Sequence, residues 1–155
     1  MTTSPTRTAA LWVPDWPVLA AMAVRDVPAH VPAATHDGRR VVAVSATARA
    51  HGVRGGMRRR RAREGCPELE LLDVDDARDA REFEPVALAA ETVVAGLEIT
   101  RPGLLLLPAA GASRYHGSDA ALAEALVARV AARTGDARPV GGAAGRRAAA
   151  RGAGG

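Results

Sequence analysis

A run of arginines is the strongest chemical signal in this sequence. Residues 58–63 read RRRRAR, which places five guanidinium groups within six positions. Guanidinium groups bind phosphate oxygens, and each phosphate that they neutralise steepens the salt dependence of nucleic-acid binding by about 0.9. The alternative is a solvated helix face that Glu64 and Glu68 partly neutralise. The predicted contacts to a DNA backbone are Arg58, Arg59, Arg60 and Arg61.

Asp15 is a second candidate, because a carboxylate at the end of a strand can hold a metal ion. It lies in the stretch LWVPDWP, residues 11–17, which contains both tryptophans of the chain. A partner on the same side of the strand would stand two residues earlier, but that position is Val13. Since Mg²⁺ needs several hard oxygen ligands, the favoured interpretation is a turn or helix-cap aspartate before Trp16.

Other groups that bind metals or act as nucleophiles show weaker patterns. The alternating charges of residues 73–82 indicate a solvated linker or helix with local ion pairs. Cys66 is the single cysteine, so an internal disulfide is excluded and a buried structural thiol is predicted. The histidines do not have metal-ligand spacing, and no metal site is predicted from them; they are His30, His36, His51 and His116.

The composition limits the scaffold that could position these groups. Hydrophobic residues make up 48% of the 155-residue chain and aromatic residues 3%, so the core must consist of leucine, valine and alanine. The formal net charge of +4 is compatible with an anionic partner such as nucleic acid. The sequence lacks an apolar run of the roughly 18 residues that span a bilayer, and it lacks a secretion signal. A cytoplasmic protein with no membrane partner is predicted.

The apolar periodicity predicts short strands that alternate with helices. The clearest helix is 83–98, and a second amphipathic helix covers 118–134 with Ser118 as its N-cap. Residues 28–40 are rich in proline and small residues and are predicted to form a loop. The other predicted strands are 8–13, 40–45, 68–74, a pair around the Pro-Gly turn at 102–103, and 137–145; the other predicted helices are 18–26, 46–53, 57–65 and one beginning at 146.

The order of these elements predicts an α+β fold. A first strand, a helix, a pair of strands, a helix and a last strand form the split βαβ pattern of a ferredoxin-like domain. A long segment is inserted after the first strand. One domain with an inserted subdomain therefore explains the order better than two independent domains do.

Three segments resemble the Y-family (UmuC-like) translesion DNA polymerases. VVAVSATARAHGVRGGM at 41–57 is similar to the fingers motif of that family. CPEL at 66–69 resembles the next landmark, and PVGGAAGRRAAARGA at 139–153 resembles a weakened segment near the end of the palm. The matching positions of the fingers motif are Ser45, Ala48, Arg49, Gly52, Val53, Gly56 and Met57.

The resemblance implies a ferredoxin-like palm with small fingers inserted after its first strand. We expect residues 1–8 to be a loose N-terminus. Residues 9–17 and 76–155 are expected to be palm-like, and residues 18–75 are the fingers-like insertion. The chain is expected to end before the thumb and the little finger, and so before a clamp-binding region.

The sequence departs from the family where carboxylates should hold two Mg²⁺ ions. Trp12 and Pro14 stand at the acidic positions of the first strand, and Pro108 and Ala109 stand at those of the second acidic motif. These departures resemble the ImuB-type branch, whose members have lost the catalytic carboxylates and act as adaptors in DNA-damage-induced mutagenesis. The resemblance implies no catalytic residue, no cofactor, and DNA, the sliding clamp and mutasome proteins as partners at the bacterial nucleoid.

Two arginines match family positions that contact the triphosphate of an incoming nucleotide. Arg49 belongs to the fingers motif, and Arg146 aligns with a lysine near the end of the palm. Two alternatives remain open at this point. The chain could be an active error-prone polymerase that binds Mg²⁺ through relocated ligands such as Asp15 and Glu98, or it could be a truncated remnant without function.

Overall fold

The computed structural model describes residues 8–134, apart from the side chains of 109–110 and 133–134. The chain divides into two compact units, which are considered separately. Unit 1 contains Met1–Val13 and Pro85–Gly155, and unit 2 contains Pro14–Glu84. Each unit has one small sheet with helices, so the predicted α+β class is confirmed.

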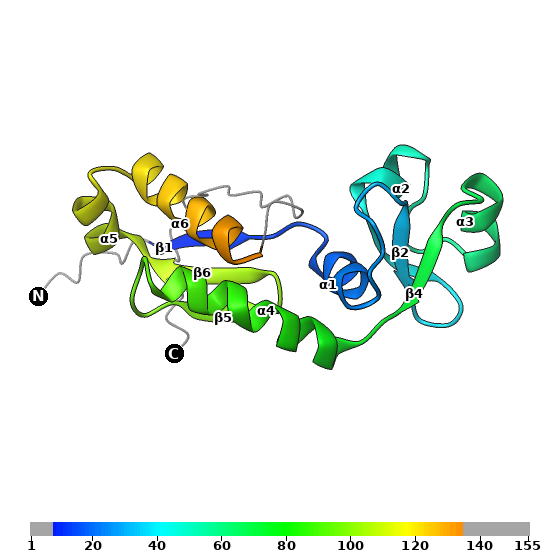
Figure 1. Ribbon diagram of the computed structural model, residues 1–155, viewed down its shortest axis with the longest axis horizontal. Coiled ribbons are helices and arrows are strands. Elements are labelled where there is room, and N and C mark those ends of the chain that lie inside the picture. The colour runs from blue at the N-terminus through cyan, green and yellow to red at the C-terminus, as the bar shows by residue number, and fades with distance from the viewer. Residues whose placement is uncertain (1–7, 135–155) are drawn as a thin grey trace, which may run out of the picture. The chain divides into compact units, whose positions relative to one another are not determined.

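Unit 1 is organised by a three-stranded antiparallel sheet in the order β1–β6–β5 (Figure 1). The central strand alternates in exposure, because successive side chains point to opposite faces, and Leu105 and Leu107 are fully buried. The edge strand β5 is exposed along its whole length. The strands are β1 Thr8–Trp12, β5 Glu98–Arg101 and β6 Leu104–Pro108, and the helices that follow them are α5 Ala109–His116 and α6 Asp119–Thr134.

Helix α6 begins where the sequence predicts. The hydroxyl of Ser118 accepts a hydrogen bond from the backbone N–H of Ala121 at 3.1 Å, which confirms Ser118 as the N-cap. Helix α5 was missed, because its segment AAGASRYH is short and has no large aliphatic residue. The hydroxyl of Ser113 donates to Asp119 at 2.6 Å and joins the two helices.

Helix α4 spans Asp76–Glu91, so the predicted range of 83–98 was wrong at both ends. The carboxylate of Asp75 accepts from the backbone N–H of Arg78 at 2.9 Å and starts the helix within the charged segment. The helix ends before Val93, and Gly96 then adopts φ +78°, a conformation that favours glycine. The apolar repeat at 83–98 therefore includes residues that follow the helix.

Unit 2 contains a second sheet, in the order β3–β2–β4. Figure 1 labels two of its strands, β2 and β4. Strand β2 pairs antiparallel with β3 and parallel with β4. The prediction of a loop over 28–40 was wrong, because β2 lies within it. All four residues of β2 are buried, and a strand covered on both faces has no alternating pattern for the sequence to display. The strands are β2 Ala33–His36, β3 Val41–Val44 and β4 Glu70–Asp73.

Two small cores cover the opposite faces of this second sheet. Ala33 belongs to the cluster formed with α1 (Trp16–Val24), and its neighbour Ala34 belongs to the cluster that contains Ala48 and Ala62. Ala48 lies on α2 (Ala46–Ala50) and Ala62 on α3 (Arg59–Gly65). The buried hydroxyl of Ser45 accepts from the backbone N–H groups of Ala33 and Ala48 at 3.1 Å each. This residue both caps α2 and fastens it to β2.

Within the described residues, no helix is long and apolar enough to cross a bilayer.

Candidate nucleic-acid interface

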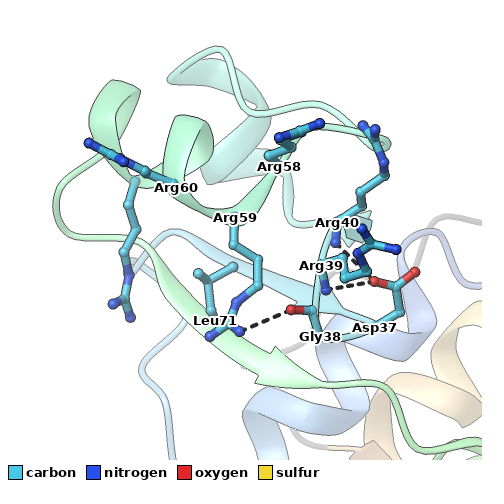
Figure 2. A pocket seen from close by; sticks show the side chains of 9 residues that line it. Asp37, Gly38, Arg39, Arg40, Arg58, Arg59, Arg60 and Leu71 are labelled. Carbon is cyan, nitrogen blue, oxygen red and sulfur yellow. Dashed lines mark hydrogen bonds between the residues drawn. The ribbon is translucent and has the colours of Figure 1, made fainter.

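An arginine-lined cleft of about 750 Å³ lies on unit 2. Its walls come from the turn between β2 and β3 and from the start of α3, as Figure 2 shows. We call it the arginine cleft. Its lining residues are Arg39, Arg40, Arg58, Arg59, Arg60 and Arg63, together with Asp37, Gly38 and Leu71.

The turn that carries two of these arginines is held by Asp37. One carboxylate oxygen of Asp37 accepts from the backbone N–H groups of Arg39 and Arg40 at 2.9 Å each. These two hydrogen bonds hold the pKa of the Asp37 carboxyl below its ordinary value, and the bond from Arg40 lowers it more than the bond from Arg39 does. Asp37 therefore serves the geometry of the turn, and that oxygen is already committed to two backbone donors.

Backbone and side-chain hydrogen bonds join the two walls of the cleft. Arg40 and Arg58 form an antiparallel β-bridge, and the N–H of Arg59 donates to the carbonyl of Arg39 at 3.2 Å. The guanidinium of Arg59 also donates to the carbonyl of Gly38 at 3.2 Å (Figure 2). The guanidinium of Arg40 donates to the carbonyl of Gly56 at 2.7 Å. The cleft is thus a formed feature of the fold.

The charge of the cleft is strongly positive. Asp37 is the single carboxylate among its lining residues. Arg60 pairs with Glu64 at 3.2 Å, but both side chains are largely exposed, and such pairs contribute little. The side chains of Arg39, Arg58 and Arg63 have no hydrogen-bond or ion-pair partner within the part of the chain that the structure describes. Such an arrangement suits an anion with several charges.

The structure divides the predicted arginine run between two surfaces. Arg58, Arg59 and Arg60 line the arginine cleft. Arg61 lines a different cavity of about 310 Å³, together with His51. The sequence reasoning missed the part that Arg39, Arg40 and Arg63 take in the cleft. The available signal was the pair of arginines directly after the His-Asp-Gly turn.

Asp15 and Arg49 form an ion pair within unit 2. The guanidinium nitrogens Nη2 and Nη1 of Arg49 lie 2.8 and 3.3 Å from the two carboxylate oxygens of Asp15. This contact raises the pKa of Arg49, mainly through the hydrogen bond and secondly through the charge of Asp15. Asp15 occupies the N-cap position of α1, but its side chain does not cap the helix. The position is therefore the predicted one, in a turn before α1, but the side chain of Asp15 binds Arg49 instead of capping the helix.

The positions expected to hold Mg²⁺ do not supply a ligand set. Trp12 pairs with Leu104, and Pro108 pairs with Thr8 at the other end of the β1–β6 ladder. The structure therefore separates Trp12 from Pro108 by about 13 Å along the strand. Indole, proline and alanine side chains lack the oxygen donors that Mg²⁺ requires, so the residues present do not fit the ion.

The remaining predicted residues fall in three places. Pro14 precedes α1, and the side chain of Ala109 and the whole of Arg146 lie outside what the structure describes. Cys66 is fully buried, as predicted, and its burial raises the pKa of the thiol. Among the described residues, no three histidine, cysteine or acidic side chains are grouped so that they could share a metal ion.

Comparison with known proteins identifies the family. The model of the impB/mucB/samB family matches residues 18–151, a range that begins after β1. No curated protein matches the chain. Two similar solved structures are a ternary complex of Dbh with partially disordered substrates and an insertion ternary complex of Dbh DNA polymerase.

The likeness to these structures covers most of this chain and a minor part of theirs. The first has a TM-score of 0.69 at 11% identity and covers 82% of this chain and 38% of Dbh. The second has a TM-score of 0.68 at 12% identity and covers 83% and 40%. The chain thus spans about two fifths of the matched structures. The chain belongs to the impB/mucB/samB family, and its described residues have the palm-and-fingers fold of a Y-family DNA polymerase-like domain.

Proposed function

We propose that this domain docks on DNA during damage tolerance and acts as a non-catalytic adaptor of the ImuB type. The observation that carries the docking role is the arginine cleft of unit 2, which concentrates guanidinium groups around one carboxylate. The similar solved structures are ternary complexes, one of them of a DNA polymerase, which agrees with a nucleic-acid partner. In this proposal residues 9–17 and 76–155 form the palm and residues 18–75 the fingers. Units 1 and 2 approximate this division, although their boundaries lie at 13/14 and 84/85.

The non-catalytic half of the proposal follows from donor chemistry. Trp12, Pro14, Pro108 and Ala109 cannot replace carboxylates as Mg²⁺ ligands. The alternative of relocated ligands would use Asp15 and Glu98. However, both carboxylate oxygens of Asp15 already accept from Arg49, so a metal would have to displace a charged partner. That cost disfavours an active polymerase.

We also propose contacts to nucleotides and to protein partners. Arg49 and Arg146 remain candidate contacts to a triphosphate, and at Arg49 the phosphate would have to displace Asp15. The sliding clamp and mutasome proteins are proposed as partners of the adaptor at the nucleoid. These nucleotide and partner contacts would be made by the complete assembly and not by the arginine cleft alone.

Replacing the predicted arginine run should weaken DNA binding and flatten its salt dependence. For the R58A/R59A/R60A/R61A variant, the slope of log affinity against log salt should become less steep by about 0.9 for each phosphate that the protein no longer neutralises. Binding of a labelled primer–template, measured by fluorescence anisotropy at several salt concentrations, gives this slope.

The matched control is R58K/R59K/R60K/R61K, which keeps all four charges. This lysine variant should keep most of the salt dependence of DNA binding. Its affinity for DNA should be lower, because lysine cannot make the bidentate hydrogen bonds that arginine makes to phosphate. An alanine variant that binds DNA with the wild-type slope would contradict the docking role of this segment.

A further inference from the structure

We propose that Arg39 and Arg63 bind phosphates on opposite walls of one built site. The ligand of the arginine cleft is a run of neighbouring backbone phosphates on a nucleic-acid strand, taken without reading its bases. This inference rests on the proposed DNA-docking function and assigns it to a surface that the arginine run alone does not define. It extends the site to the β2–β3 turn and removes Arg61 from it.

Guanidinium groups without a partner among the described residues reach the cleft from both of its walls. Arg39 stands on the β2–β3 turn, and Arg63 stands on α3, so the two reach the cleft from different elements. Neither side chain has a hydrogen-bond or ion-pair partner among the described residues. Arg40 and Arg59, by contrast, donate to backbone carbonyls and fix the walls. The cleft thus combines structural arginines with arginines that are available to a ligand.

The size and the lining of the cleft indicate which kind of anion it binds. The volume of about 750 Å³ and the spread of six guanidinium groups around it exceed what one phosphate needs. The lining has no aromatic side chain on which a base could stack, and Leu71 is its single apolar member. A polyanion of regularly spaced charges matches this lining, and a nucleic-acid backbone is such a polymer.

Asp37 has two opposing effects on anion binding in the cleft. Its carboxylate is the negative charge in the cleft, yet it also orders the turn by accepting from the N–H groups of Arg39 and Arg40. Charge alone predicts that any neutral replacement tightens anion binding. A built site predicts instead that two neutral replacements have opposite effects on binding. Asp37→Asn keeps an acceptor oxygen and should tighten binding, whereas Asp37→Ala releases the turn and should weaken it.

The main test compares two double variants that each remove two exposed arginines. R39A/R63A removes one arginine without a described partner from each wall of the cleft and leaves the third, Arg58, in place. R25A/R81A removes two exposed arginines that do not line the cleft. The full chain is titrated with a labelled DNA strand and with its duplex at several salt concentrations. For R39A/R63A the salt slope should fall by about 1.8 on the duplex and by about 1.4 on the single strand, whereas for R25A/R81A it should change little. Equal losses in the two variants would overturn the inference.

Further experiments distinguish a nucleic acid from other polyanions, and they distinguish a failure of the proposed function from a failure of this inference. Inorganic triphosphate and poly-glutamate serve as competitors at equal total charge. Strong competition by poly-glutamate would assign the cleft to acidic protein segments and overturn the nucleic-acid assignment. Equal effects of Asp37→Asn and Asp37→Ala on DNA binding would overturn the claim that the site is built. Wild-type protein that does not bind DNA would reject the proposed function itself, whereas binding unaffected by R39A/R63A would reject the inference alone.

Discussion

Replacing Arg78 with alanine should destabilise unit 2 by about 3–5 kcal/mol, because it leaves a buried carboxylate without its partner. Arg78 and Asp79 are 7% and 6% exposed. The guanidinium donates through Nε and Nη2 to the same oxygen of Asp79, at 3.1 and 2.9 Å, and through Nη1 to the carbonyl of Asp73 at 2.9 Å. One side chain therefore neutralises Asp79 and connects α4 to the end of β4.

The destabilisation of R78A should depend on pH. Burial raises the pKa of Asp79, and Arg78 opposes this rise. A raised pKa in the folded state means that the contribution of Asp79 is most favourable below its ordinary pKa and declines as pH rises through the folded pKa. Without Arg78 the folded pKa should rise further. The destabilisation of R78A should therefore be largest near neutral pH and should shrink in acid, where Asp79 is protonated.

Urea denaturation at several pH values measures this effect, and R81A is the matched control. Arg81 is an exposed arginine on the same helix, and its replacement should change the free energy of unfolding by less than about 0.5 kcal/mol. A destabilisation in R78A that is no larger than that in R81A, or one that stays constant into acid, would contradict the role of the buried pair.

Replacing Phe83 with alanine should cost about 3–5 kcal/mol, the usual penalty for removing a buried aromatic ring. Phe83 is 1% exposed and meets Trp16 edge to face, with ring centroids 5.2 Å apart. Trp16 is itself 2% exposed, and its indole N–H donates to the backbone carbonyl of Asp79 at 2.9 Å. In a chain with 3% aromatic residues, this pair is a large part of the apolar packing at α1.

A graded series separates packing from hydrogen bonding at this pair. Trp16→Phe keeps a ring but removes the N–H donor, so the acceptor carbonyl is left without its indole partner at a cost of about 1 kcal/mol. The F83A effect should be several times larger. Unfolding of F83A can be followed by the fluorescence of Trp16 in a W12F background. The W12F replacement removes the signal of the other tryptophan, which is 45% exposed. Wild-type stability in F83A would show that this aromatic pair is dispensable.

Local signals predicted a large part of the fold. The predicted strand over 40–45 and the short helix after it are both found in the structure, because β and helix propensities act over a few residues. Ser118 is a helix cap that the sequence predicts, since capping is equally local. The α+β class followed from the order of such segments.

The misses have a common physical cause, which is tertiary context. Strand β2 has the composition of a loop, and it is stabilised by cover on both faces and by pairing with β3 and β4. The start of α4 depends on the Asp75 cap within a charged segment that also fits a linker.

The candidate site shows the same limit. The arginine run was evident, but its division between two surfaces depends on the orientation of α3. Arg39 enters the cleft because the β2–β3 turn bridges to residue 58. The pairing of Asp15 with Arg49 joins residues 34 positions apart, a contact that no local pattern encodes.

Primer extension by the full chain tests the central claim of binding without catalysis most directly. A labelled primer–template is incubated with the protein, all four deoxynucleotides and either Mg²⁺ or Mn²⁺, and a known polymerase serves as the positive control. Anisotropy of the same label reports whether the DNA is bound. We predict a bound primer of unchanged length. Robust, metal-dependent addition of nucleotides by the wild-type chain would contradict the account.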